Sequence, residues 1–120
     1  WAAERMTVDN PLVIDLVTVD PLTGIVSLIM VEHREWGEAG ELLPDLQAKL
    51  NAYFAYVESG QLVQDFPDVA GKPITFLLNH VYELGPRERE FIRIAVQQHF
   101  VPAGITWRHE MLGRNGVKPN

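Results

Sequence analysis

The chain has 120 residues, of which 47% are hydrophobic and 22% are charged, as is typical of one globular domain and not of a disordered chain. The net charge of −6 argues against nucleic-acid binding, which needs a basic face, and suits a basic protein partner. The absence of cysteine excludes disulfides, thiol catalysis and thiolate zinc sites, and no apolar run approaches the ~20 residues of a membrane span.

Two strands joined by a tight turn open the predicted domain. Residues 12–19 are rich in β-branched side chains, which favour extended structure. Residues 20–24 combine a proline that presets φ with a glycine that accepts a left-handed conformation. Residues 25–32 continue as a second apolar strand. The sequence therefore predicts an antiparallel hairpin.

A long amphipathic helix is predicted next, starting near residues 41–44 and ending at Glu58. Residues 37–40 form the preceding loop, and Pro44 falls in the first helical turn, where proline is tolerated. Apolar residues recur at helical spacing on one stripe, namely Leu43, Leu46, Leu50, Phe54 and Val57. Gly60 then suits the position that ends a helix.

The second half of the chain predicts one more strand, one more helix and a short final strand. Residues 61–72 are a connection, and residues 74–82 are apolar on both faces, as is typical of a central strand. Pro86 begins a helix that ends before Pro102, and residues 105–110 form the last strand. We expect the charged residues of that helix to face solvent: Arg87, Glu88, Arg89, Glu90 and Arg93.

This order of elements, β-β-α-β-α-β, predicts an α+β fold. The expected architecture is a two-layer sandwich with a four-stranded sheet and two helices on one face, because each crossover between parallel strands is right-handed. We expect residues 10–112 to form a single domain. Residues 1–9 are assigned to an N-terminal extension, of which residues 1–5 need not be native, and residues 113–120 to a flexible C-terminal tail.

The sheet face turned away from the helices is predicted to be apolar. The strands at residues 25–32 and 74–82 carry apolar side chains in both registers, so one apolar set must face away from the helices. An apolar face of this kind is usually covered. A second copy of the chain, forming a homodimer, is one possible cover, and the N-terminal segment or the tail is the other.

Two segments at strand ends hold the candidate pocket or interface residues, which are Glu32, His33, Glu35, Trp36, Asn79 and His80. One interpretation is a pocket in which His33 acts as an acid–base group or ligand, a glutamate orients it and Trp36 forms a wall. In the other, Trp36 closes the end of the core, and the strand that holds His80 simply emerges from the core near Glu83. We prefer the second, because a single histidine without a convergent partner is a weak signal. No catalytic residue, metal ligand or cofactor is therefore assigned.

Two further patterns each leave two interpretations open. Because His33, His80 and His109 lie on three predicted strands, a metal site is a conceivable alternative to separate structural roles. Acidic side chains that follow the second strand could steer a basic partner onto this surface, or could simply form a solvated loop and helix start. These acidic residues are Glu32, Glu35, Glu38, Glu41 and Asp45.

Two short motifs carry a resemblance to a known family. His33-Arg34-Glu35-Trp36 and residues 58–62 (Glu-Ser-Gly-Gln-Leu) are similar to motifs of a bacterial family of small uncharacterised proteins, domain of unknown function 6572. The resemblance extends over residues 10–82 and departs at Glu32, where an aspartate is expected, and at Pro44. It implies a bacterial, cytoplasmic protein, and it carries over no activity and no catalytic residue.

The sequence therefore predicts a non-enzymatic protein-binding or assembly module. It would act as a homodimer or against a basic protein partner, and an immunity or antitoxin-like role is one version of this function. The alternative is a small enzyme or ligand-binding protein with a pocket around His33, Trp36 and His80. We expect no nucleic acid, membrane or cofactor to be bound. An open cleft in which His33 and a carboxylate converge would favour the alternative.

Overall fold

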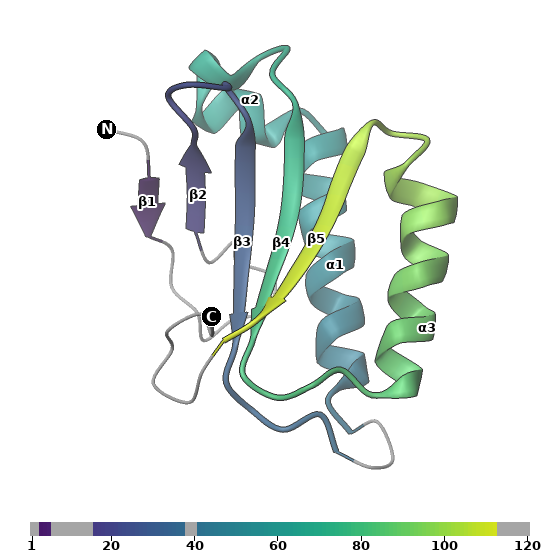
Figure 1. Ribbon diagram of the computed structural model, residues 1–120. Coiled ribbons are helices and arrows are strands. Elements are labelled where there is room, and N and C mark those ends of the chain that lie inside the picture. Colours follow the sequence, from purple (N-terminus) through teal and green to yellow (C-terminus); the bar gives the residue numbers. More distant parts are fainter. Residues whose placement is uncertain (1–2, 6–15, 38–40, 113–120) are drawn as a thin grey trace.

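The computed structural model describes residues 3–5, 16–37 and 41–112, and these residues form an α+β fold (Figure 1). The predicted fold class and the order of the main elements are confirmed. None of the described helices is both long and apolar enough to cross a membrane. In chain order the elements are β1 (Ala3–Arg5), β2 (Leu16–Val19), β3 (Val26–Glu32), α1 (Leu43–Glu58), α2 (Gln61–Asp65), the 3-10 turn η1 (Pro67–Val69), β4 (Ile74–His80), α3 (Pro86–Ala95), the π-helical segment η2 (Val96–Phe100) and β5 (Ile105–Met111).

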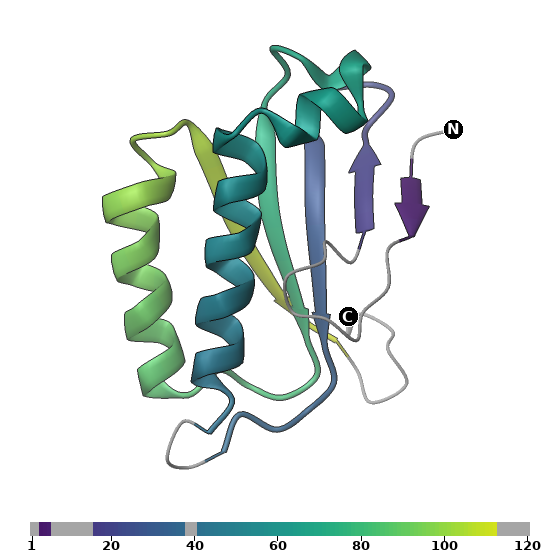
Figure 2. The ribbon, with the colours of Figure 1, turned by 180° about the vertical axis from the view of Figure 1, so that it is seen from behind.

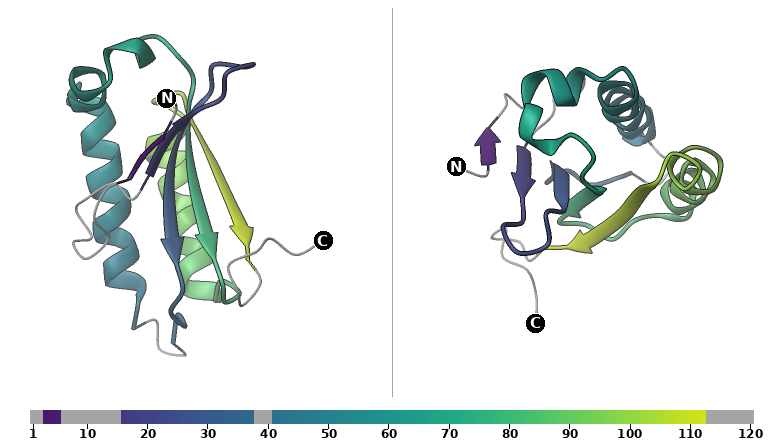
Figure 3. Two further views of the ribbon diagram at one scale, coloured as in Figure 1. Left: turned by 90° about the vertical axis from the view of Figure 1, so that its left-hand side faces the viewer. Right: turned by 90° about the horizontal axis from the view of Figure 1, so that it is seen from above.

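The strands form one sheet in the order β1-β2-β3-β4-β5. The pairs β1–β2 and β2–β3 are antiparallel, whereas β3–β4 and β4–β5 are parallel. Parallel neighbours need a crossover connection, and the segments that contain α1 and α3 supply the two crossovers. Both long helices lie across the same face of the sheet, as predicted. They stand in front of the sheet in Figure 2 and on one side of it in the view from above in Figure 3.

The predicted hairpin between β2 and β3 is confirmed in its described part. Its turn is held by Asp20, whose carboxylate accepts hydrogen bonds from the backbone N–H groups of Leu22 (2.8 Å) and Thr23 (3.3 Å). Gly24 takes φ 75°, and its N–H donates to the Asp20 carbonyl at 2.8 Å. Residues 12–15 of the predicted first strand lie outside the described residues.

Two segments contain more regular structure than the sequence predicts. Ala3–Arg5, in the predicted extension, pairs with β2, so the prediction of four strands is corrected to five. A three-residue strand is too short to show a periodic pattern, and its hydrogen bonds depend on a partner distant in sequence. The predicted connection at residues 61–72 contains α2 and η1, which bury Leu62 and Val69. The predicted tail, residues 113–120, lies outside the described residues.

The core lies between the sheet and the two long helices. On α1 the deepest aromatic residue is Tyr53, whose hydroxyl donates to the Ile29 carbonyl of β3 at 3.1 Å. Its ring meets Phe76 of β4 edge-on, with the centroids 5.7 Å apart. These contacts hold α1 against the centre of the sheet. The fully buried side chains include Val17, Val26, Leu28, Met30, Phe76 and Leu78 from the sheet and Leu50, Tyr53 and Phe100 from the helical layer.

The sheet face turned away from the helices is mixed and not uniformly apolar as predicted. Strand register aligns one row of hydroxyl side chains across it, Thr18, Ser27, Thr75 and Thr106. The next row is aliphatic until it reaches β5, and it consists of Leu16, Ile29, Leu77 and Arg108. On β5, Arg108 forms an ion pair with Glu110 at 2.6 Å. This composition weakens the hydrophobic argument for a homodimer, and self-association through this face stays a prediction.

Candidate functional site

The carboxyl ends of the parallel strands and the amino ends of the two long helices meet at one end of the molecule, the lower end in Figure 1. We call this the carboxyl end of the sheet. In open sheets of parallel strands, ligands commonly bind in a crevice at this end. Glu32 of β3 and His80 of β4 are register partners here, so the two predicted groups of candidate residues lie on neighbouring strands.

Trp36 closes the core at the carboxyl end, as one of the two interpretations predicts. Only 4% of its surface is exposed, and its Nε1–H donates to the Tyr82 carbonyl at 3.1 Å. Its own carbonyl accepts a hydrogen bond from the Leu42 N–H at 3.2 Å. The segment that follows β3 is thereby fastened both to the segment that follows β4 and to the start of α1.

His80 and Asn79 do not form a site together, because they lie on opposite faces of β4. His80 is buried, and its ring packs against that of His109 on β5, with the centroids 5.6 Å apart. The chain leaves the core just after His80, because Tyr82 and Glu83 are exposed, whereas His80 itself lies inside the core. Its Nδ1 lies 2.7 Å from the Tyr82 carbonyl oxygen, which places the hydrogen on Nδ1. Asn79 lies on the face turned away from the helices.

The first cleft at this end lies between the end of β3 and the first turns of α1 and has a volume of about 410 Å³. We call it the Arg34 cleft. Arg34 donates to both carboxylate oxygens of Glu32 (2.8 and 3.0 Å) and to Asp45 (3.2 Å). His33 is exposed and makes no hydrogen bond or ion pair with another described residue. The residues that line the cleft are Met30, Val31, Glu32, His33, Arg34, Trp36, Asp45, Leu46, Lys49 and Leu78.

In the Arg34 cleft, the guanidinium of Arg34 forms ion pairs with the carboxylates of Glu32 and Asp45. Burial by itself would raise the pKa of Glu32, but the hydrogen bonds from Arg34 and the charges of Arg34 and Lys49 outweigh it, so this pKa lies below its ordinary value. The same hydrogen bonds, together with the charges of Glu32 and Asp45, raise the pKa of Arg34. Among the described residues no carboxylate forms a hydrogen bond or ion pair with His33, so the described part of the cleft does not show the convergent acid–base pair that catalysis at His33 would need.

The second cleft lies on the other side of Trp36, between the segment after β3 and the start of α3, and has a volume of about 460 Å³. We call it the Glu88 cleft. Among the described residues that line it, three carboxylates stand against the single guanidinium of Arg87. Glu88 is only 2% exposed, and its Oε2 is buried without a hydrogen-bond partner among the described residues. The lining residues are Glu35, Trp36, Gly37, Tyr82, Glu83, Gly85, Pro86, Arg87 and Glu88.

Glu88 is the residue that the sequence assignment missed, because it is buried and not exposed as predicted. Gly85 caps α3 and Pro86 begins it, so Glu88 is the third helical residue and its carboxylate turns back toward the helix amino end. A Cβ added to Gly85 would stand 2.5 Å from Oε1 of Glu88, so the carboxylate packs closely against this glycine and would have to shift if a side chain replaced it. The signal in the sequence is a Gly-Pro-x-Glu helix start, in which an acidic third residue follows a glycine.

His109 predicts a pH dependence of stability. Partial burial of the ring, aided by the charges of His80 and Arg89, lowers the pKa of His109 below the ordinary 6.5. The folded state therefore favours neutral His109, a contribution that is complete above the unfolded pKa and is lost as the pH falls below it. We expect the free energy of unfolding to decrease between about pH 7 and pH 5, above the range in which Glu32 titrates, and to decrease less in His109→Asn.

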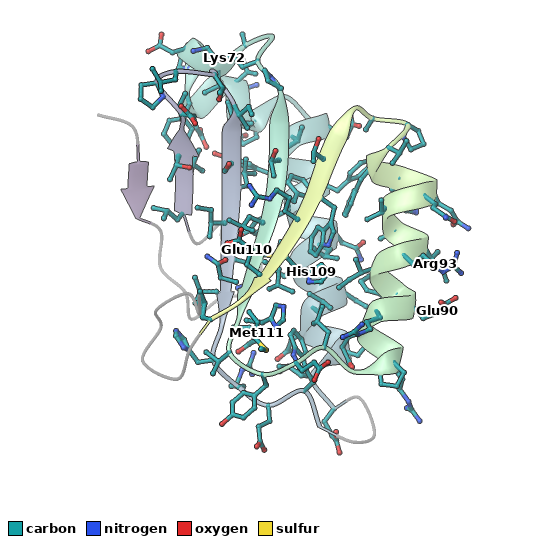
Figure 4. The ribbon with its side chains drawn as sticks, in the orientation of Figure 1. Lys72, Glu90, Arg93, His109, Glu110 and Met111 are labelled. Carbon is teal, nitrogen blue, oxygen red and sulfur yellow. The ribbon has the colours of Figure 1, made fainter. Side chains whose placement is uncertain are left out.

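Urea titrations at several pH values measure this dependence. The exposed His33→Asn is the matched control, and it should follow the wild-type curve. Identical pH curves for His109→Asn and the wild type would contradict the assignment. His109 projects from β5 near the labelled Met111 in Figure 4, at the carboxyl end of the sheet.

The six predicted site residues do not converge on one cleft. Glu32, His33 and Trp36 line the Arg34 cleft, Glu35 and Trp36 line the Glu88 cleft, and neither Asn79 nor His80 lines either. Over residues 3–5, 16–37 and 41–112, no cluster of three or more histidine, aspartate or glutamate side chains could hold a metal ion.

Comparison with known proteins identifies a family. Residues 6–113 match the model of the family of unknown function DUF6572, which agrees with the resemblance in the sequence motifs. The match covers most of the chain, and the protein belongs to this family. No curated protein and no solved structure matches the chain.

Proposed function

We propose that this member of the DUF6572 family is a protein-binding module that recognises a basic partner at the carboxyl end of its sheet. The observation that supports this function is the charge imbalance of the Glu88 cleft, where three glutamates, Glu35, Glu83 and Glu88, outnumber two arginines: Arg87 in the lining, and Arg89, which pairs with Glu83 at 3.2 Å. Glu35 and Glu83 are exposed, so they are accessible to a partner. The net charge of −6 would steer a basic protein toward this molecule.

An immunity or antitoxin-like role is one version of this function. In that role a small acidic protein binds and covers a basic surface of a toxin. The size of the chain and its net charge support this version. The exposed position of Glu35 and Glu83, at the end of the molecule where α3 begins, is also suited to a surface that docks as a rigid body.

A small-ligand function at the Arg34 cleft is the second candidate. Its volume of about 410 Å³ lies within the range of small-molecule sites. Its charges, however, are already paired with one another, and a ligand would have to displace or extend that network. The Glu88 cleft keeps one carboxylate in excess even when the ion pair of Arg89 with Glu83 is counted, and for this reason we favour the basic protein partner.

Charge reversal at the rim of the Glu88 cleft tests the proposed function. Immobilised wild-type protein should capture a basic protein from cells of its source at low ionic strength, and added salt should release it. The double variant Glu35→Lys/Glu83→Lys should capture at least about tenfold less, because it places like charges against the partner.

The matched control is Glu58→Lys/Asp68→Lys, which makes the same change in net charge with two exposed residues at the other end of the molecule. This control should keep the captured protein. Equal loss in both double variants would show a general effect of net charge, and equal capture in both would exclude the Glu88 cleft as the docking surface.

A further inference from the structure

We propose that the Glu88 cleft binds a primary ammonium group on an alkyl chain, the end of a lysine side chain from the partner. This inference rests on the proposed function and names the chemical group that the acidic cleft would receive. It is carried by the burial of Glu88, by the way its carboxylate is held, and by the side chains that stand beside it.

The first step is the uncompensated carboxylate. Glu88 is 98% buried, yet its Oε2 has no hydrogen-bond partner among the described residues. Buried polar atoms almost always have a partner, and a buried charge is costly unless an opposite charge neutralises it. The amino end of α3 supplies a partial positive charge to Glu88, but not a full one. A cation in the adjoining cleft would supply the rest.

The second step is the surrounding charge. Glu35 and Glu83 also line the cleft and carry the same sign as Glu88. Arg87 is the one basic residue among the described lining residues, and Arg89 pairs with Glu83 from outside the lining at 3.2 Å, so carboxylates exceed guanidinium groups by one. Because Glu88 is only 2% exposed, its charge acts on a bound cation more strongly than an exposed carboxylate would.

The third step distinguishes an ammonium from a guanidinium. A guanidinium binds a carboxylate best through two parallel hydrogen bonds, one to each oxygen. In Glu88 one oxygen is packed against Gly85, where a Cβ would stand only 2.5 Å away, so the two oxygens are not presented together. An ammonium is a compact charge that needs no such pair. The apolar surfaces of Trp36 and Pro86 beside it suit an alkyl chain.

A titration with n-butylammonium, the end of a lysine side chain, tests the inference in the full chain. The indole N–H of Trp36 reports on the cleft in NMR spectra, because it donates to the Tyr82 carbonyl at the cleft wall. We expect a saturable shift of this resonance with a dissociation constant on the order of 10 mM, as suits a ligand of about five non-hydrogen atoms. Butan-1-ol, which lacks the charge, should give no saturable shift. n-Butylguanidinium should bind more weakly than n-butylammonium.

Two variants identify the carboxylate responsible. Glu88→Gln keeps the size of the side chain and removes its charge, and it should weaken n-butylammonium binding about tenfold or more. Glu90→Gln is the matched control, because Glu90 lies on the outer side of α3, where it pairs with Arg93 at 2.6 Å (Figure 4). The affinity of Glu90→Gln for n-butylammonium should equal that of the wild type. If Glu88→Gln does not fold, the comparison of n-butylammonium with butan-1-ol in the wild type decides.

Equal shifts with butan-1-ol, no saturable shift with n-butylammonium, or wild-type affinity in Glu88→Gln would each overturn the inference. The proposed function fails by a different result, namely unchanged capture of the basic protein by Glu35→Lys/Glu83→Lys. Loss of capture in that variant, combined with no binding of n-butylammonium, would keep the docking surface and reject the lysine site.

Discussion

Replacement of Trp36 by alanine is expected to lower the free energy of unfolding by about 3–5 kcal/mol, as truncation of a large buried side chain does. Trp36 is 4% exposed, and its indole N–H donates to the Tyr82 carbonyl. The substitution would leave a cavity at the end of the core and separate two segments that this side chain joins. Urea denaturation followed by circular dichroism measures the loss.

Trp36→Phe is the matched control, since it keeps most of the apolar volume and removes only the N–H donor. The Tyr82 carbonyl would still accept from His80, so we expect a loss of at most about 2 kcal/mol. Unchanged melting of Trp36→Ala would show that this residue serves a surface and not the core. Because Trp36 lines both clefts, the alanine variant should also lose binding at each.

Replacement of Phe100 by alanine is the second large effect that we expect, again about 3–5 kcal/mol of the free energy of unfolding. Phe100 is 2% exposed and ends the π-helical segment η2. Its ring meets Phe76 edge-on at 5.1 Å and stacks on Trp107 of β5 at 6.1 Å. On the α1 side it contacts Phe54 at 5.9 Å. One side chain therefore joins both long helical segments to two strands.

The control for Phe100→Ala is its neighbour Val101→Ala. Val101 is 63% exposed, so its truncation should change the free energy of unfolding by no more than about 0.5 kcal/mol. Equal effects of the two substitutions would contradict the assignment of Phe100 to the core. Thermal melts of both variants at one pH are sufficient for the comparison.

Much of the fold could be predicted because its signals are local. The turn at Asp20 and Gly24 predicts the hairpin through residues that contact one another within five positions of sequence. The stripe that contains Leu46 and Leu50 predicts α1 and its buried side in the same way. β1 could not be predicted, because its three residues gain their structure only by pairing with β2.

The candidate site was predicted only in part. The segment after β3 was correctly placed at the end of the sheet, because a strand that ends in Glu32 must continue from that edge. The partner of that segment was not predictable, since the hydrogen bond from Trp36 to Tyr82 joins residues 46 positions apart. The sequence predicts that Glu88 faces solvent, because helical periodicity shows only which side of a helix is apolar. It does not show which distant segments cover the first turn of the helix.

The sequence by itself determined the α+β class, the order of the main elements, the family and the net charge of −6. The tertiary structure alone decided that His80 and Glu88 are buried, that Asn79 faces away from the helices and that two clefts flank Trp36. The physical reason is distance along the chain. Turns and helical stripes arise from neighbouring residues, whereas burial of a charged side chain depends on which distant segments pack over it.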